Sequence, residues 1–146
     1  MGEMDCSSKK TTSSQEDYLE AVFLLEMRHG SARVSDIAEM VGVGKSAASL
    51  AVKALQERGF VLHDSYGRVR LTPQGREIGE KVSRRHFIIR DFLHEVLGVP
   101  MEEAESAACG IEHVVSALVI QRFSEMLAAF RSGVPFPRKE IKEDSK

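Results

Sequence analysis

Long apolar runs and cysteines are scarce in this sequence. No apolar segment approaches the roughly 20 residues that a membrane-spanning helix needs, and the polar N-terminus lacks the apolar core of a secretory signal. We therefore expect a cytoplasmic protein with no membrane partner and a disordered lead-in over residues 1–13. The two cysteines are Cys6 and Cys109. Because Cys6 lies in that lead-in, we expect no structural disulfide, and reduced thiols fit the cytosol.

The chain also lacks a net positive charge, but its basic residues are concentrated in one segment. The net charge is −2 over 146 residues, yet residues 33–85 hold ten Lys or Arg against six Asp or Glu. Residues 1–32 hold three against six, and residues 86–146 hold seven against ten. A basic segment between two acidic ones can be merely a solvated face. It indicates nucleic-acid binding only if the same segment also carries a DNA-reading motif.

Apolar periodicity predicts a mainly helical chain. We expect helices over residues 16–28, 34–41, 46–58, 72–97, 101–115 and 116–130, with strands over 60–64 and 68–71 around a turn at 65–67. Small hydroxyl residues are expected to cap several of them: Ser13 or Ser14, Ser35, Ser46 and Thr72.

Helix, Gly-Val-Gly turn, helix and then a two-stranded hairpin is the order of a winged helix-turn-helix. The predicted fold is thus mainly α: an N-terminal winged helix-turn-helix with a small β-hairpin wing, and a C-terminal all-helical dimerisation domain. The expected ranges are 14–75 for the DNA-binding domain, 76–132 for the helical metal-binding and dimerisation domain, and 133–146 for a flexible tail. Dimerisation is expected because the last helices hold more apolar residues than a thin monomer can cover.

The second helix of such a unit presents its N-terminal residues to base edges in the major groove. The wing tip, which is basic and bears an aromatic residue, suits backbone and minor-groove contacts. The predicted DNA-binding residues are therefore Lys45, Ser46, Ala47 and Ser49 in the helix and Tyr66, Arg68 and Arg70 in the wing. The alternative is a small helical domain with a hairpin that binds no nucleic acid.

Carboxylate, imidazole and thiol groups recur at helical spacings. Asp17 and Glu20 share a helix face at i, i+3, and so do Cys109, Glu112 and His113 at i, i+3, i+4. His86 lies on the helix between these two groups. A donor set rich in oxygen and nitrogen with one sulfur suits a first-row divalent cation rather than a closed structural zinc site. Each group alone is more often a core thiol, a capping acid or a surface histidine.

Five ordered motifs together resemble the diphtheria toxin repressor family, and most closely its manganese transport regulator branch. They are EDYLE at 16–20, RVSDIAE at 33–39, LTPQGREIG at 71–79, RRHFIIRDFL at 84–93 and CGIEHVVS at 109–116. The resemblance implies a cytoplasmic homodimer that binds palindromic double-stranded operator DNA when loaded with Mn²⁺ or Fe²⁺ and represses metal-uptake genes. The family's metal positions fall on Asp17, Glu20, His86, Cys109, Glu112 and His113.

The implied metal site is a hybrid of two branches. Asp17 and Glu20 resemble the manganese branch, whereas Cys109 stands where that branch has Glu and the iron branch has Cys. Mn²⁺ is therefore the expected activator and Fe²⁺ the alternative, and Zn²⁺ or Co²⁺ can bind in vitro. Glu105 aligns with an ancillary ligand position of the iron branch and is an outside candidate.

Two other functions remain open at this point. One is a metal-independent winged-helix regulator that senses an oxidant or a small molecule through Cys109. Chelation and oxidation would distinguish the two regulators by their effect on operator binding. The other is a metalloenzyme with Glu112 as a general base near an open coordination position. The DNA-reading module argues against an enzyme.

Overall fold

The computed structural model describes residues 10–135, which form two compact units divided between Arg84 and Arg85. The predicted lead-in up to residue 9, with Cys6, and the tail from residue 136 lie outside the described residues. Within residues 10–135, no helix combines the length and apolar character that crossing a membrane requires.

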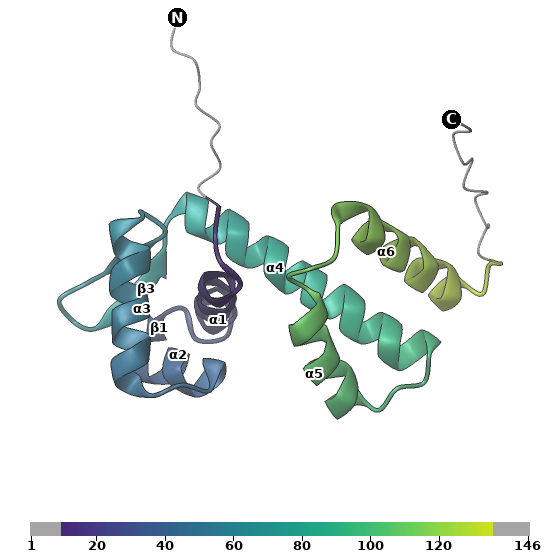
Figure 1. Ribbon diagram of the computed structural model, residues 1–146, viewed down its shortest axis with the longest axis horizontal. Coiled ribbons are helices and arrows are strands. Elements are labelled where there is room, and N and C mark those ends of the chain that lie inside the picture. The colour runs from purple at the N-terminus through teal and green to yellow at the C-terminus, as the bar shows by residue number, and fades with distance from the viewer. Residues whose placement is uncertain (1–9, 136–146) are drawn as a thin grey trace, which may run out of the picture. The chain divides into compact units, whose positions relative to one another are not determined.

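Apart from one short additional strand, the first unit has the order of elements predicted from the sequence, and Figure 1 shows them in purple to teal. It consists of α1 (Ser13–His29), β1 (Ala32–Arg33), α2 (Val34–Val41), α3 (Lys45–Glu57), β2 (Val61–His63), β3 (Arg68–Leu71) and the first turns of α4 (Pro73–Asp91). The winged helix-turn-helix is thus confirmed.

Helix α1 lies at the centre of this unit, where Figure 1 views it nearly along its axis. It contacts α2, α3, β1 and β3. Leu19 and Val22 are fully buried, and the core continues through Ile37 and Leu55. A helix that must pack on several sides cannot have one narrow apolar stripe, which is why α1 carries apolar residues on more than one face.

The start of α1 corrects a predicted cap. We expected Ser13 or Ser14, but the N-cap is Thr12, whose hydroxyl accepts a hydrogen bond from the Gln15 amide at 3.1 Å. The Gln15 side chain in turn accepts from the Thr12 amide at 3.2 Å. This reciprocal pair satisfies two amides that a helix start otherwise leaves without partners, so it is favoured over a single serine.

The caps predicted for the two helices of the DNA-reading motif were also wrong. Helix α2 has Arg33 as its N-cap and α3 has Gly44, and neither makes a side-chain cap hydrogen bond. At α2 the reason is a strand that sequence reasoning missed, because Ala32 and Arg33 pair with β3 and lead directly into the helix. Between the helices Gly42 has a φ of 81°, which explains glycine at this turn.

The hairpin forms as predicted, and β1 extends it to a three-stranded antiparallel sheet in the order β1-β3-β2. Val61 pairs with Leu71, and His63 pairs with Val69. Along β3, Val69 and Leu71 point into the core, while Arg68 and Arg70 alternate outwards. The strand therefore anchors the wing and presents two guanidinium groups to solvent.

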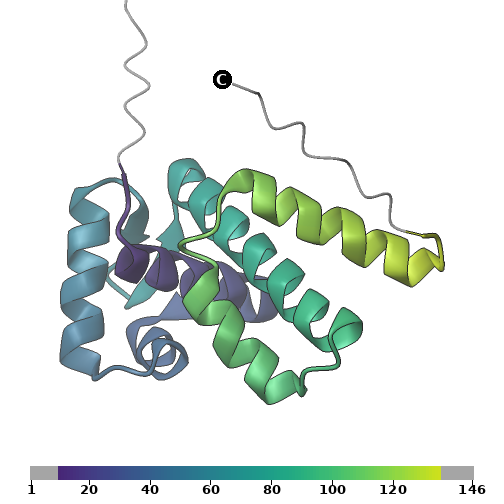
Figure 2. The ribbon, with the colours of Figure 1, turned by 45° about the vertical axis from the view of Figure 1, so that its right-hand side comes forward.

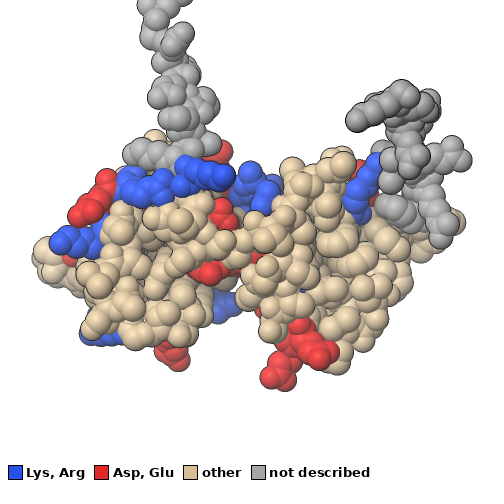
Figure 3. Space-filling model, viewed as in Figure 1, with Lys and Arg blue, Asp and Glu red and all other residues tan. Residues whose placement is uncertain are grey.

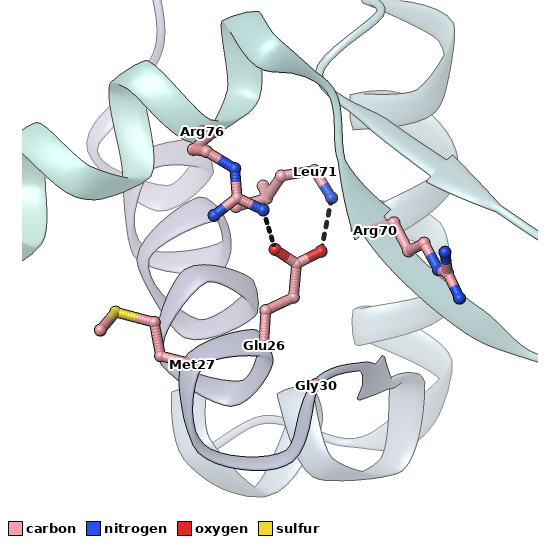
Figure 4. Close-up of a pocket in the computed structure, with 6 residues that line it drawn as sticks. All are labelled: Glu26, Met27, Gly30, Arg70, Leu71 and Arg76. Carbon is pink, nitrogen blue, oxygen red and sulfur yellow. Dashed lines mark hydrogen bonds and ion pairs between the residues drawn. The ribbon is translucent and has the colours of Figure 1, made fainter.

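A single carboxylate ties α1 to the base of the wing. Glu26 Oε1 accepts a hydrogen bond from the Leu71 amide at 3.0 Å, and its Oε2 lies 2.6 Å from Nη2 of Arg76. Figure 4 shows Arg76 directed at Glu26, whereas Arg70 extends away from it. Glu26 thus joins the end of α1 to β3 and to the first turn after Pro73.

Helix α4 begins as predicted and then passes very close to its neighbours. The Thr72 hydroxyl accepts from the Gly75 amide at 3.1 Å and donates to the Gly59 carbonyl at 2.7 Å. A Cβ on Gly75 would lie 2.0 Å from the Phe60 carbonyl oxygen, and one on Gly79 would lie 2.7 Å from that of Leu19. Two glycines one turn apart therefore allow α4 to approach the backbone of the unit.

The second unit is entirely helical among the described residues. It contains the last turns of α4, the π-helical segment η1 (Phe92–Val96), α5 (Met101–Ile111) and α6 (Ala117–Ser132). Both α5 and α6 contact η1, and Figure 2 shows α5 in green and α6 in yellow-green to yellow. Phe92 stacks on Phe123 with ring centroids 4.5 Å apart, which joins η1 to α6.

Three helix ends in this unit differ from the prediction. The helix expected to reach Leu97 changes to π-helical geometry after Asp91. The helix expected over 101–115 ends at Ile111, and the last one continues to Ser132 instead of ending at Phe130. The early end of α5 has a physical cause, because Ser116 is extended and its hydroxyl caps α6 by accepting from the Val119 amide at 3.3 Å.

Several apolar residues of the last two helices, which were expected to support a dimer, are exposed in the single chain. Val114 is 80% exposed and Leu118 is 62% exposed, whereas Leu127 is buried. The exposed large apolar residues from the end of α5 onward are Val114, Leu118, Val119, Phe130 and Val134. Such a set on one small helical unit is more typical of an interaction surface than of a solvated face.

Candidate nucleic-acid interface and metal centre

The exposed side of α3 carries the residues predicted to read DNA. Ala48, Val52 and Leu55 are buried against the core, as the helical spacing predicted. Lys45, Ser46, Ala47 and Ser49 are all exposed, and they occupy the first turns of α3. Since the N-terminal residues of a recognition helix approach base edges, this arrangement leaves the four side chains available for a groove.

The wing presents its predicted residues in the same way. Tyr66 is 83% exposed, and Arg68 and Arg70 are also exposed. The turn below them is organised by Asp64, whose Oδ1 accepts hydrogen bonds from the Tyr66 and Arg68 amides, both at 2.9 Å. The hydrogen bond from the Arg68 amide is the main reason that the pKa of Asp64 lies below its ordinary value of 3.8, despite an opposing effect of desolvation.

Charge is unevenly distributed over the surface of each unit. In the view of Figure 3, Lys and Arg side chains gather along the upper edge of the first unit, while acidic side chains gather at the lower end of α5 in the second. Glu102 and Glu103 belong to the first turn of α5, where negative charge favours the helix dipole. The basic residues therefore belong to the unit with the DNA-reading motif.

Four of the six predicted metal ligands converge in the second unit. His86 Nδ1 lies 2.8 Å from Glu112 Oε2 and 3.8 Å from the sulfur of Cys109. His113 Nε2 lies 3.3 Å from Glu112 Oε1. The carboxylate of Glu112 thus lies between two imidazoles, and the Cys109 thiol joins the cluster through His86.

The helix ends explain how this cluster is assembled. Cys109 is still within α5, but Glu112 is its C-cap, and His113 lies in the turn that follows. Cys109, Glu112 and His113 were predicted to share one helix. Because α5 ends at Ile111, the turn after it, rather than a further helical turn, keeps His113 near the other two. Arg85 supports this turn, because its Nη1 lies 3.5 Å from the Glu112 carbonyl oxygen.

The other ring nitrogen of His86 faces a second carboxylate. His86 Nε2 lies 2.6 Å from Glu105 Oε2, and Glu105 Oε1 accepts from Arg90 Nη1 at 3.0 Å. Partial burial raises the pKa of Glu105, but hydrogen bonds from Arg90 and His86 bring it below the ordinary value of 4.5. Glu105 is therefore an anion held between two donors.

The remaining predicted ligands, Asp17 and Glu20, lie on α1 in the first unit. They are one helical turn apart, as the spacing predicted, and Glu20 is buried. A carboxylate that lies so close to a hydrophobic core is unusual unless it has a partner.

Donor chemistry and burial in the second unit fit a divalent cation. The side chain of Glu112 is completely buried, and its Oε1 is a buried oxygen with no hydrogen-bond partner despite the nearby His113. A buried carboxylate oxygen left in this way costs about 1–3 kcal/mol or more. The cost falls if a cation takes that position, and imidazole, carboxylate and thiolate are all ligands of first-row metals.

Sequence reasoning missed Arg90, Glu26 and Asp64 as supporting residues. Asp64 had a usable signal, because Asp just before a Gly-containing turn often accepts from the backbone two residues on. Glu26 and Arg90 had none, since their partners lie 45 and 15 residues away in the chain. Only the fold brings those groups together.

Models of two domains from one family match consecutive parts of the chain. The N-terminal DNA-binding domain of iron-dependent repressors matches residues 10–69. The metal-binding and dimerisation domain of iron-dependent repressors matches residues 72–133. These matches cover almost all of the described residues.

Individual relatives agree with the domain models. The HTH-type transcriptional regulator MntR of Bacillus pumilus is 36% identical over 120 residues, which cover 82% of this chain and 83% of the relative. MntR of Bacillus velezensis is 34% identical over 136 residues, covering 93% and 94%.

Solved structures show the same fold. A manganese-dependent transcriptional repressor in complex with manganese has a TM-score of 0.71 at 30% identity, covering 86% of this chain and 55% of that one. The manganese regulator SloR has a TM-score of 0.70 at 30% identity, covering 81% and 55%. The chain thus spans about half the length of these solved proteins. The family expected from the sequence motifs is confirmed: the chain belongs to the iron-dependent repressors, which are metal-dependent DNA-binding transcriptional regulators.

Proposed function

We propose that this chain represses metal-uptake genes as a cytoplasmic homodimer that binds a palindromic operator when it carries Mn²⁺, with Fe²⁺ as the alternative activator. The proposed ligands are Asp17, Glu20, His86, Cys109, Glu112 and His113. The proposed DNA contacts are Lys45, Ser46, Ala47, Ser49, Tyr66, Arg68 and Arg70. The observation that carries the proposal is the buried Glu112 carboxylate, which lies beside the imidazoles of His86 and His113, with the Cys109 thiol 3.8 Å from His86 Nδ1.

The donor set supports Mn²⁺ over a thiophilic metal, but only narrowly. Asp17, Glu20 and Glu112 would offer hard oxygen ligands, which Mn²⁺ favours. Cys109 would offer a soft ligand, which favours Fe²⁺, Co²⁺ or Zn²⁺. The names of the MntR relatives and of the manganese-bound repressor support manganese. Tighter binding of Zn²⁺ in vitro follows the usual affinity order and does not require that Zn²⁺ activates.

Dimerisation is supported by the apolar residues that the single chain leaves exposed. Val114 and Leu118 lie near the start of α6, and Phe130 lies near its end. A two-fold axis would place the same residues of two chains against each other and bring two α3 helices to symmetric half-sites. Half-sites about one helical turn apart, or a multiple of that spacing, would then form the palindrome.

Coupling between metal and DNA follows from where the proposed ligands lie in the chain. Asp17 and Glu20 belong to the unit that reads DNA, whereas the other four belong to the helical unit. When bound, a divalent cation supplies positive charge that acidic ligands from both units can share. Its binding would favour the arrangement of units that fits the operator. By linkage, operator DNA should tighten metal binding by the same factor.

The proposal is tested by operator binding with defined metals. A pool of random duplexes is enriched on the purified chain in MnCl₂ under anaerobic conditions, and binding of the enriched duplex is followed by fluorescence anisotropy. We expect tight binding with Mn²⁺ or Fe²⁺ and its loss in EDTA. Binding that survives EDTA but is lost on oxidation would instead favour the metal-independent regulator that senses oxidants through Cys109.

The Glu112→Ala and His113→Ala variants identify the site. Each should abolish metal-stimulated DNA binding, because each removes a donor from the cluster, while helix content and dimer mass stay the same. Arg122→Met is a matched control in the same unit, since Arg122 pairs with Glu125 of its own helix at 3.1 Å. If either cluster variant still binds the duplex tightly and only with metal, the switch does not use this site.

A further inference from the structure

His86 is supported by a chain of alternating charges that leads away from the ligand cluster. Its Nε2 lies 2.6 Å from Glu105 Oε2, and Glu105 Oε1 accepts from Arg90 at 3.0 Å. Arg90 also donates through Nε to Asp91 Oδ1 at 2.9 Å, and Asp91 Oδ2 lies 3.0 Å from Arg131. The chain runs from the cluster to the C-terminal end of α6, entirely within the second unit.

Arg90 is held in place from more than one side. Its guanidinium carbon lies 4.7 Å from the centre of the Phe87 ring, and its other contacts are the carboxylates of Asp91 and Glu105. Only 23% of its side chain is exposed. A guanidinium group restricted in this way donates in a fixed geometry, so it can fix the orientation of a carboxylate that it contacts.

Each ring nitrogen of His86 lies beside a different carboxylate, and only one of the two belongs to the proposed ligand set. Glu105 accepts at Nε2, and the nitrogen that remains, Nδ1, faces Glu112 and Cys109. A histidine that binds a metal through one nitrogen usually donates the other N–H to a carboxylate, which fixes the ring and makes the ligand more basic. Glu105 occupies that position here.

We propose that Arg90 and Glu105 are positioning residues for the metal centre: Arg90 fixes the Glu105 carboxylate at His86 Nε2, so that Nδ1 is the ligand nitrogen. This inference rests on the proposed function, because it assumes that the His86 cluster binds a divalent cation. It goes further by assigning Glu105 a role outside the ligand set and by giving Arg90 a function.

The competing role for Glu105 predicts the opposite effect of one substitution. If Glu105 were itself a ligand, Arg90 would compete with the cation for its carboxylate, and removing Arg90 would tighten metal binding. If Glu105 positions His86, removing Arg90 lets the carboxylate turn away and weakens metal binding. Arg90→Met keeps much of the side-chain length and apolar contact with Phe87 while removing every donor.

The experiment measures Mn²⁺ affinity of the full chain from the EPR signal of the free ion. Arg90→Met and Glu105→Gln should each weaken Mn²⁺ binding by roughly 10- to 100-fold, the usual effect of losing the partner of a ligating histidine. The double variant should be no weaker than Glu105→Gln alone, since Arg90 acts through Glu105. The Mn²⁺ affinity of Arg90→Lys should lie between those of the wild type and Arg90→Met, because lysine keeps the positive charge but lacks the planar guanidinium with its paired donors.

A spectroscopic readout separates positioning from a loss of general stability. In the chain loaded with Zn²⁺, nitrogen-resolved NMR should show His86 with Nε2 protonated, and that proton should exchange slowly with water. In Arg90→Met, loaded with Zn²⁺ to the same occupancy, the Nε2 proton should exchange faster. Arg122→Met, which removes an Arg–Glu pair on α6, should change neither the affinity nor this signal.

Each outcome decides the proposal. Unchanged or tighter Mn²⁺ binding in Arg90→Met overturns it, and so does full additivity in the double variant. If the wild-type chain shows metal-dependent DNA binding while these variants behave like wild type, only the positioning role fails. If the wild-type chain binds none of Mn²⁺, Co²⁺ and Zn²⁺, the proposed function fails and this inference fails with it.

Discussion

At the scale of single residues, Asp64 organises the wing turn and Glu112 organises the ligand cluster in a similar way. Each is a carboxylate that gathers donors from its own neighbourhood, Asp64 from two wing amides and Glu112 from side chains of the cluster. One oxygen of Asp64 accepts two hydrogen bonds from its own turn, whereas Glu112 keeps a buried oxygen without a hydrogen bond. The first arrangement organises the wing turn, and the second leaves a place for a ligand.

The wing turn should loosen in acid. The folded pKa of Asp64 is below its ordinary value of 3.8, so its ionised form stabilises the turn above that value, and the stabilisation is lost as pH falls through the folded pKa. We expect NMR shifts of the Tyr66 and Arg68 amides to titrate together with a midpoint below 3.8. In Asp64→Asn this titration should be absent. A midpoint at or above the ordinary value would show that the amide hydrogen bonds do not persist.

Cys109 should determine how strongly the centre favours Mn²⁺. Cys109→Glu replaces a soft thiolate by a hard carboxylate, so it should increase activation of duplex binding by Mn²⁺ relative to Co²⁺ and Zn²⁺. The measurement is anisotropy of the enriched duplex against each metal. Cys109→Ser serves as a control that removes the sulfur without adding charge. An unchanged ranking of the activating metals in Cys109→Glu would mean that Cys109 is not a ligand.

At the scale of elements, periodicity was sufficient to predict every helix of the described chain and the hairpin, but not the caps. Caps depend on which side chain reaches an amide three residues ahead, and Thr12 with Gln15 competes successfully with Ser13 and Ser14. The two-residue strand β1 was too short to show any alternation, and only its pairing with β3 defines it. The end of α5 depends on the cap of α6, which is a property of the next element.

The residues of the candidate site could be predicted from the sequence, but most of the contacts between them could not. Spacing placed Cys109, Glu112 and His113 together and left His86 for another helix, and the structure brings these four residues into one cluster. The roles of Glu105 and Arg90 were beyond reach of the sequence, because the hydrogen bond between them requires α5 to pack beside the end of α4. Residue spacing within one helix carries no information about such a contact.

The close approach of α4 to α1 should be sensitive to a single methyl group. In Gly79→Ala the added Cβ would lie 2.7 Å from the Leu19 carbonyl oxygen, so the backbones must separate. We expect a loss of about 1–3 kcal/mol in unfolding free energy in urea, as is typical of overpacking. Gly110→Ala in α5, where an added Cβ would meet no packing neighbour within 4 Å, is the matched control and should be neutral or stabilising. Equal stability of the two variants would contradict the close packing.

At the scale of the whole molecule, the exposed apolar residues should govern association. Leu118→Glu places a charge on a side chain that is 62% exposed in the single chain, so it should leave the fold intact and prevent dimerisation. Sedimentation equilibrium at micromolar concentration should change from dimer to monomer, and duplex binding should weaken. Gln121→Glu adds the same charge to the same helix and should remain dimeric. A dimeric Leu118→Glu would place the interface elsewhere.

Helix α4 belongs to both units, because it runs unbroken from Pro73 to Asp91 while the division falls at Arg84. Helix formation is cooperative and its first turns are the costly ones. Gly75 and Gly79 weaken the intrinsic stability of those first turns by roughly 1 kcal/mol each relative to alanine. We therefore expect the first turns of α4 to form when they pack on the first unit rather than alone. A substitution that disturbs this packing should therefore weaken the helical hydrogen bonds of α4 as far as His86. Hydrogen exchange of the amides from His86 to Asp91 should be faster in Gly79→Ala than in Gly110→Ala, although the substitution lies in the other unit.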